Sequence, residues 1–196
     1  MKTSDKKDYH PQITAKNAIE WRKWLSENHQ KEDNIWLVIF KKESEIESVY
    51  YDEAVDEALC FGWIDSKINK KDEKSFYQYF SKRNPKSNWS RVNKNKIKRL
   101  LNANKMEKAG LQMIEIAKKT GTWNALDDVE NLILPKEMQE IFDKKENKEA
   151  KENFDKFPRS AKRAILEWIF NAKTLPTKLK RINETIEAAK ENKRVK

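Results

Sequence analysis

The stretch NIWLVIF at residues 34–40 constrains the fold of this chain more than any other. Its β-branched and aromatic residues are too dense for an exposed helix, and polar residues border it on both sides, which predicts a buried strand. A buried strand needs hydrogen-bonding partners in a sheet. Residues 63–68 and 75–80 have the composition of strands, and the polar turn at 69–74 between them predicts an antiparallel pair.

Helical patterns surround these strands. Asn17 is expected to begin a helix, because Asn-Ala-Ile-Glu fits a capping box in which Asn17 accepts from the amide of Glu20 and Glu20 reaches back in return. The stripe that contains Trp21 then faces the core. Residues 48–61 have apolar side chains on one side and carboxylates on the other, which predicts a helix whose acidic side faces solvent. Gly62 is expected to end that helix in the left-handed conformation.

After Asn84-Pro85 the pattern is wholly helical. The sequence therefore predicts an α+β fold, with a small antiparallel sheet packed by helices and followed by a helical carboxyl-terminal part. We expect residues 1–16 to form a flexible leader. Residues 17–134 then form the α+β domain, and residues 135–196 form a helical region that packs on it.

The net charge of +10 points to partners that carry negative charge. A positive field attracts a small anionic ligand, an acidic protein or nucleic acid. The chain is also rich in Lys, Asn, Ile and Glu and poor in Gly, as proteins from AT-rich genomes tend to be. Composition alone therefore leaves open whether the charge is functional.

A single cysteine, Cys60, excludes an intrachain disulfide and a zinc site built from several thiolates. It lies near a helix carboxyl end, where the dipole does not lower a thiol pKa, so we expect a buried and inert thiol. Metal-ligand spacing and a glycine-rich phosphate loop are both absent, and we expect no metal and no cofactor. Without a signal peptide or a long apolar run, the chain is expected to be soluble and cytoplasmic, with no membrane span.

Four blocks of the chain, at residues 57–67, 80–93, 106–123 and 168–182, read EALCFGWIDSK, FSKRNPKSNWSRVN, MEKAGLQMIEIAKKTGTW and WIFNAKTLPTKLKRI. In that order they resemble the bacterial YdeI/OmpD-associated family, whose members are often labelled bacteriocin-protection proteins. The resemblance implies a YjbR/CyaY-like amino-terminal region and a link to bacteriocin or stress resistance, but no particular reaction. The chain departs from the family at residues 81–83, where a proline often precedes the arginine, and at residues 174–180, where a threonine-arginine element is usual.

The candidate site combines polar and aromatic residues from one strand and from the next strand-to-helix joint: Trp63, Asp65, Lys67, Arg83, Asn88, Trp89, Ser90 and Asn93. The two-residue spacing of the first three is expected to place them on one face of the strand. A helix capped by Ser87 or Asn88 would offer free amides and a favourable dipole to an anion. Arg83 could then bind the same anion against Trp89. We therefore predict a binding protein for an anionic ligand or partner that does not catalyse.

Other interpretations of these residues remain open. In a purely structural one, Asp65 and Arg83 form an ion pair, Ser87 is a cap, and both tryptophans belong to the core. In an enzymatic one, a reaction of unknown type takes place in a pocket formed by Trp63, Asp65, Arg83 and Trp89.

Nucleic acid is a further alternative partner. Ten basic residues and one acidic residue lie between Lys82 and Lys108, with Trp89 among them. Basic side chains with an interleaved aromatic ring can contact phosphates and stack a base. A last alternative is a helper protein whose carboxyl-terminal helices dock a partner, which would require a large exposed apolar patch.

Overall fold

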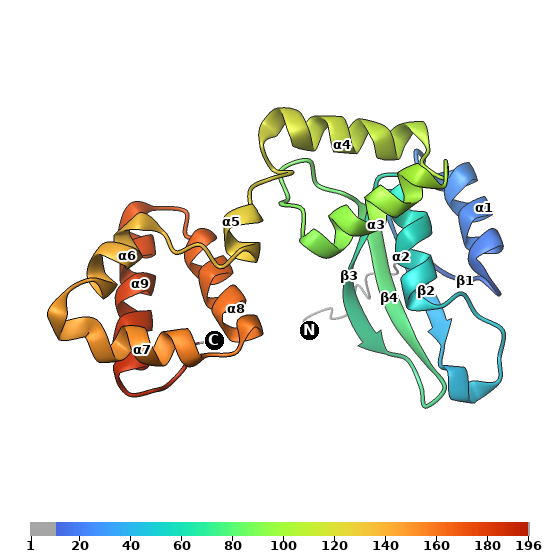
Figure 1. Cartoon of the computed structure of the whole chain (residues 1–196). Coiled ribbons are helices and arrows are strands. Elements are labelled where there is room, and N and C mark those ends of the chain that lie inside the picture. The colour runs from blue at the N-terminus through green and yellow to red at the C-terminus, as the bar shows by residue number, and fades with distance from the viewer. Residues whose placement is uncertain (1–10, 196) are drawn as a thin grey trace, which may run out of the picture. The chain divides into compact units, whose positions relative to one another are not determined.

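The computed structural model describes residues 11–195, and the chain divides into two compact units, Met1–Trp123 and Asn124–Lys196 (Figure 1). Every strand of the described residues lies in the first unit, and the second unit is helical. This confirms the α+β fold with a helical carboxyl-terminal part. The division falls after Trp123 and not at the expected boundary after residue 134. The packing of residues 135–196 on the first unit stays a prediction.

The amino-terminal unit consists of β1 (Gln12–Thr14), α1 (Ala18–Asn28), β2 (Asn34–Phe40), the 3-10 turn η1 (Lys42–Ser44), α2 (Tyr51–Cys60), β3 (Trp63–Lys70), β4 (Ser75–Lys82), α3 (Arg91–Asn102) and α4 (Lys108–Thr120). Its sheet has the strand order β1-β2-β4-β3. The antiparallel pairing of β3 with β4 is confirmed, and β4 pairs antiparallel with β2. Because β1 joins β2 in parallel, the sheet is mixed and not wholly antiparallel.

Strand β1 lies within the stretch that the sequence suggested as a leader. Its residues pair with β2, and the amide of Trp36 donates to the carbonyl of Pro11 at 3.0 Å. Three residues are too few to show the two-residue period of a strand, and main-chain pairing needs no particular side chains. The leader predicted for residues 11–16 is therefore wrong in part, and residues 1–10 lie outside the described residues.

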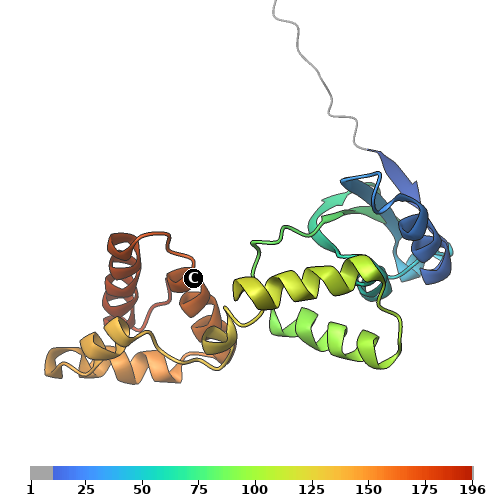
Figure 2. The same ribbon diagram turned by 90° about the horizontal axis from the view of Figure 1, so that it is seen from above.

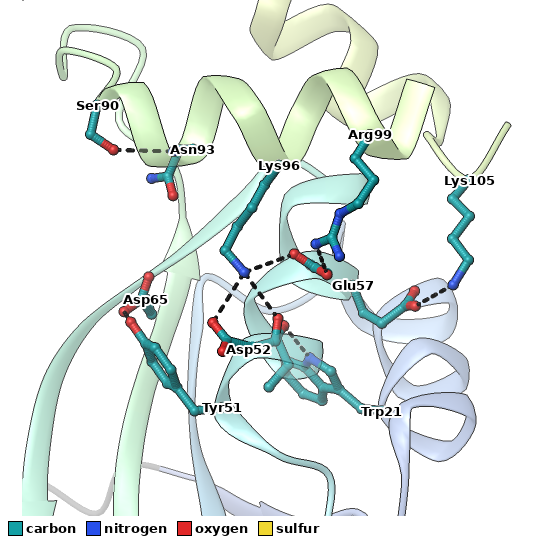
Figure 3. Close-up of polar contacts among 12 residues, drawn as sticks. Trp21, Tyr51, Asp52, Glu57, Asp65, Ser90, Asn93, Lys96, Arg99 and Lys105 are labelled. Atoms are coloured by element: carbon teal, nitrogen blue, oxygen red, sulfur yellow. Dashed lines mark hydrogen bonds and ion pairs between the residues drawn. The ribbon is translucent and has the colours of Figure 1, made fainter. Parts of the chain in front are cut away.

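The start of α1 follows the predicted cap. The Asn17 side chain accepts from the amide of Glu20 at 3.0 Å, whereas the Glu20 carboxylate accepts from the amide of Lys16 at 2.8 Å and not from that of Asn17. The expected inward stripe is confirmed by Trp21, which is fully buried. Its indole N–H donates to the carbonyl of Ala54 at 3.0 Å, which ties α1 to α2 (Figure 3).

The core of the unit lies between one face of the sheet and helices α1 and α2. Ile35 and Leu37 from β2 and Phe80 from β4 are buried on that face and pack with apolar residues of both helices. Helices α3 and α4 contact α2 in turn. Figure 2 shows them on the same side of the sheet as α2. The side chains of α3 and of the β4–α3 loop are thereby brought close to the start of α2.

Two glycines allow neighbouring segments to pack closely against the end of α2. Gly62 adopts a φ of +74°, as predicted for the residue that ends this helix. Gly110 in α4 lies against the last turn of α2, since a Cβ at this position would be 2.3 Å from the carbonyl oxygen of Cys60. The backbones of α4 and α2 therefore approach more closely than any side chain would permit.

The carboxyl-terminal unit consists of α5 (Asp127–Glu130), α6 (Lys136–Phe142), the 3-10 turn η2 (Lys145–Asn147), α7 (Lys148–Lys156), α8 (Arg159–Phe170) and α9 (Leu175–Lys190). It has a hydrophobic core of its own, to which α8 contributes Ala161, Ile165 and Ile169 at helical spacing. Pro176 lies in the first turn of α9, where a helix tolerates proline because the amide there has no helical acceptor. Within residues 11–195, no helix is both long and apolar enough to span a bilayer.

Candidate anion-binding site

The site is built around Arg83, the first residue after β4. Its amide donates to the carbonyl of Gly62 at 3.0 Å, which extends the contact of β4 with the start of β3. The chain then turns through an exposed loop and enters α3 at Ser90. The β3–β4 pair therefore fixes the backbone of Arg83. The loop that follows brings the start of α3 back to the Arg83 side chain.

The guanidinium of Arg83 is buried, with 5% of the residue exposed. Nη2 donates to the carbonyl of Asn88 at 2.7 Å. Cζ lies 3.8 Å from the centroid of the Trp89 ring, so the indole covers one face of the guanidinium. Nε is buried and has no acceptor among residues 11–195. A charged group is thus held out of water with one of its donors unsatisfied.

Burial lowers the pKa of Arg83 to about 10, and the charge of Asp65 opposes this effect only in part. Within the described chain the two residues form no ion pair. Asp65 instead accepts a hydrogen bond from the hydroxyl of Tyr51 at 2.7 Å (Figure 3). Burial and this bond raise the pKa of Tyr51 above its usual range. The ion pair expected in the structural interpretation is therefore not formed.

Trp89 belongs both to the core and to the site. It is 3% exposed, and its ring lies 5.1 Å from that of Trp123. Its amide donates to the carbonyl of Thr122 at 3.2 Å. The segment after α4 therefore holds Trp89 in place, and Trp89 in turn fixes the plane of the Arg83 guanidinium.

The helix at the site begins later than predicted. Ser90 is the N-cap of α3, and its side chain accepts from the amide of Asn93 at 3.2 Å (Figure 3). Ser87 does not cap the helix, because its hydroxyl donates to the carbonyl of Asn84 at 2.7 Å. Asn88 contributes its carbonyl to Arg83. The positive end of the α3 dipole thus lies next to the Arg83–Trp89 pair.

Two predicted site residues do not join this group. Trp63 is 1% exposed, donates its indole N–H to the carbonyl of His29 at 3.2 Å and packs edge-on against Trp24, so it is a core residue. Lys67 is exposed and lies within the irregular segment between Asp65 and Ile68, where the β3–β4 register shifts. Because such a bulge interrupts the alternation of faces, the shared face expected for residues 63, 65 and 67 does not extend to Lys67.

Asp65 nevertheless lies on the helix-covered face. It is directly opposite Phe80 in the β3–β4 register, and side chains that face each other across a pair of strands point to the same side of the sheet. This places the carboxylate at the start of α2, within reach of Tyr51. The sequence analysis did not include Tyr51 or Trp123 in the site. Each is far along the chain from its partner, and no local pattern indicates such a contact.

The acidic side of α2 is solvated, as the sequence suggested, only in its first turn, where Asp52 and Glu53 are exposed. Asp56 binds Lys96 at 3.0 Å and also binds Arg99, and Glu57 is buried beside Lys105 (Figure 3). Three basic side chains of the 82–108 segment thus face carboxylates of the same chain. Their charge is partly neutralised, although nucleic-acid binding by this segment stays a prediction.

Cys60 is fully buried, and burial raises the pKa of its thiol to about 11 despite a hydrogen bond with Arg22 that acts in the opposite direction. A nucleophilic cysteine needs the reverse shift. In the described part of the chain, no group of three or more histidine, cysteine or carboxylate side chains could hold a metal ion.

No curated protein and no solved structure is significantly similar to the chain. Residues 131–192 match the family model described as "Bacteriocin-protection, YdeI or OmpD-Associated", which confirms the resemblance for the carboxyl-terminal unit. Residues 13–113 match a different model and do not support a YjbR/CyaY-like assignment. That second match spans just over half of the 196 residues and includes the blocks at 57–67 and 80–93. The chain belongs to the family described as "Domain of unknown function (DUF8412)".

Proposed function

We propose that the protein binds an anionic ligand, or an acidic group of a partner, through Arg83 and the start of α3, and that it does not catalyse a reaction. The single observation that carries the proposal is the buried guanidinium of Arg83, whose Nε has no acceptor among the described residues. Buried charges in proteins are normally paired. A bound anion would supply the missing partner.

The energetics support an occupant at this position. A buried donor without an acceptor destabilises a fold by roughly 1–3 kcal/mol. The lowered pKa of Arg83 shows that its surroundings disfavour the charged form. An oxygen anion at Nε would oppose both effects, and the helix dipole behind Ser90 would add to the attraction.

The same groups favour binding over catalysis. With a pKa of about 10, Arg83 stays protonated at neutral pH and cannot act as a base. Asp65 is engaged by Tyr51, and the thiol of Cys60 is protonated and buried. We place the protein in the cytoplasm, where a lone cysteine stays reduced.

The physiological role is proposed from the carboxyl-terminal unit. Its match to a family described by bacteriocin protection supports a role in resistance to bacteriocins or to stress. Anion binding by the amino-terminal unit would then be the property through which the protein recognises a ligand or an acidic partner.

Substitution of Arg83 tests the proposal. The probes are acetate and methyl phosphate at millimolar concentration, added to the full chain and followed by NMR shifts of the tryptophan indole N–H groups. We expect saturable shifts in the wild type and none in Arg83→Met. The control is Arg99→Met, which removes an arginine whose side chain is 63% exposed and should leave the shifts intact.

The Arg83→Met variant is also expected to fold. Replacing an unpaired buried charge with an apolar side chain of similar length is often neutral or stabilising, and a thioether packs well on an indole. Its melting temperature should lie within a few degrees of the wild-type value. Anion binding that persists in Arg83→Met would overturn the proposal, as would a crystal structure grown with the probes in which Nε binds only water.

An electrophoretic mobility-shift experiment with single-stranded and double-stranded nucleic acid at low salt distinguishes this function from the nucleic-acid alternative. Binding through the basic segment would weaken steeply as salt rises, because phosphate contacts release counterions. We expect at most weak retardation, since Lys96, Arg99 and Lys105 already face carboxylates of α2.

A further inference from the structure

We propose that the face of the sheet opposite the helices is a second binding surface, which takes a neutral glycan. This surface, the aromatic face, is centred on Trp36 of β2 and on Tyr77 and Tyr79 of β4. It is separate from Arg83 and the start of α3, so the inference does not depend on the proposed function.

The strand register places the three rings on one side of the sheet. Trp36 lies directly opposite Tyr79, and Tyr77 lies two residues away along β4, so all three side chains point the same way. Ile35 and Leu37, on either side of Trp36, belong to the core and point the opposite way. Helices α1 to α4 lie on that opposite side (Figure 2). Among the described residues of the amino-terminal unit, no helix therefore covers the aromatic face.

The rings form a connected cluster on the sheet. The centroid of the Trp36 ring lies 4.9 Å from that of Tyr79 and 5.9 Å from that of Tyr77, and both pairs are edge-on. Val38 is on the same face, directly opposite Tyr77, yet it is only 3% exposed. The neighbouring side chains therefore lie across Val38. The result is a broad apolar surface that is partly open to solvent.

Uncharged polar groups belong to the same surface. The indole N–H of Trp36 and the hydroxyl of Tyr77 form no hydrogen bond with residues 11–195, so both can bind a ligand. Amides and hydroxyls both donate and accept hydrogen bonds, as sugar hydroxyls do. The register assigns further amide and hydroxyl side chains to this face: Gln12, Thr14, Asn34, Asn69 and Ser81.

The scarcity of charge favours a neutral ligand. In the whole chain 38% of residues are charged. On the aromatic face Lys67 is the one charged residue among the described strand residues, and it lies with Ser66 opposite Tyr79 where the β3 register shifts. A surface for nucleic acid would place several basic side chains beside its rings. A surface with a single lysine instead suits a partner without charge.

A glycan combines the two properties that this surface matches. The C–H bonds on the faces of a sugar ring are weakly positive and pack on the negative faces of aromatic rings. The sugar hydroxyls then form hydrogen bonds with the amides and hydroxyls around the rings. A purely apolar partner would bury those polar groups without donors or acceptors, which is unfavourable.

The test uses three uncharged oligosaccharides, cellohexaose, maltohexaose and chitohexaose, with the full wild-type chain. Saturation-transfer NMR detects the sugar C–H protons that lie close to the protein, and a titration gives the affinity. We expect saturable binding of at least one glycan. Its Kd should change by less than about twofold between about 50 mM and 500 mM NaCl, because salt screens only interactions between charges.

Trp36→Leu removes the central ring but leaves an apolar side chain beside Val38. We expect this variant to bind the glycan about tenfold more weakly or worse, as is typical for a central aromatic residue of an interface. Its melting temperature shows whether it is folded, and Tyr79→Leu is a second variant for which the same loss is expected. The control is Phe170→Leu, which removes a ring that is 42% exposed in the carboxyl-terminal unit and should bind like the wild type.

Absence of saturation transfer to all three glycans overturns the inference, as does binding that both ring variants leave unchanged. Two other occupants of the aromatic face would also overturn it. Retardation of an oligonucleotide that is lost in Trp36→Leu would make the face a nucleic-acid surface. A dimer that sedimentation detects in the wild type but not in Trp36→Leu would make it an interface between two copies of the chain.

Discussion

Arg22 on α1 donates a hydrogen bond to the carboxylate of Glu57 on α2 at 2.7 Å, and the Glu57 side chain is only 6% exposed. Arg22 also binds Glu107, the residue that precedes α4, and donates to the carbonyl of Lys105 at 2.9 Å. A single guanidinium thus joins three segments of the amino-terminal unit around a buried carboxylate. Such a carboxylate depends on its partner, because an unpaired buried charge is strongly destabilising.

We predict that Arg22→Met lowers the free energy of unfolding by about 2–4 kcal/mol. Glu57 would retain only Lys105, whose amine is 3.5 Å away and whose side chain is about half exposed. Urea denaturation followed by tryptophan fluorescence measures this loss. The double variant Arg22→Met/Glu57→Gln should recover much of it, since it removes the buried charge together with its partner.

Arg99→Met is the matched control for this prediction. Arg99 also binds a carboxylate of α2, but its side chain is 63% exposed, and Lys96 remains on Asp56 when Arg99 is removed. The expected loss is about 0–1 kcal/mol. Equal losses in the two variants would show that burial of Glu57 is not what makes the Arg22 contact important.

Local signals in the sequence were sufficient for most elements of the amino-terminal unit. The cap at Asn17, the buried strand from Asn34 to Phe40 and the left-handed Gly62 each follow from a few adjacent residues, and all three are confirmed. These features depend on backbone conformation and on side-chain period, which are properties of short segments.

Contacts between segments that are far apart in the chain could not be predicted from such local signals. Glu57 has the spacing of a solvated residue, and its burial depends on Arg22 and Lys105, which are both far away in the chain. Ser87 and Ser90 are equally good caps by residue type. Which of them caps α3 depends on where the loop after β4 ends and the helix begins. For the site, the sequence predicted Arg83 beside Trp89 but not the Tyr51–Asp65 bond.

The close contact of Gly110 with α2 likewise has no signal in the local sequence. A Cβ here would lie 2.3 Å from the carbonyl oxygen of Cys60 and 2.8 Å from that of Leu59, and both are backbone atoms that cannot turn aside. We predict that Gly110→Ala destabilises the fold by about 2–3 kcal/mol, although alanine favours a helix by about 1 kcal/mol. Thermal unfolding followed by circular dichroism measures the change.

Gly121→Ala is the comparison for that variant. Gly121 has a φ of +79° but open space around its Cβ position, so only the left-handed conformation is penalised, by about 1 kcal/mol. If Gly110→Ala is no more destabilising than Gly121→Ala, α4 can move away from α2 at little energetic expense.

The cap of α3 gives a third prediction. Ser90→Ala removes the acceptor of the Asn93 amide and should lower stability by about 1 kcal/mol. Ser87→Ala removes only a bond to the carbonyl of Asn84 in an exposed turn and should have a smaller effect. Chemical denaturation of both variants ranks them, and the reverse order would place the start of α3 at Ser87.

The thiol of Cys60 gives the last two predictions. Its pKa of about 11, against an ordinary value of 9.0, leaves about a hundredfold less thiolate at pH 8, and the side chain is fully buried. Labelling by a disulfide reagent at pH 8 should therefore be slow in the native protein and rapid in guanidinium chloride. Rapid labelling of the native protein would instead reveal an accessible and activated thiol.

The same shift affects stability at high pH. Between about pH 9 and pH 11 the unfolded chain loses the thiol proton while the folded chain keeps it, so folding binds a proton and stability falls as pH rises. Cys60→Ala removes this contribution and should make the pH dependence of the free energy of unfolding shallower in that window. The comparison uses slopes, because the cavity left by the substitution lowers stability at every pH. Parallel curves for the two proteins would mean that Cys60 has the same pKa in the folded and unfolded chains.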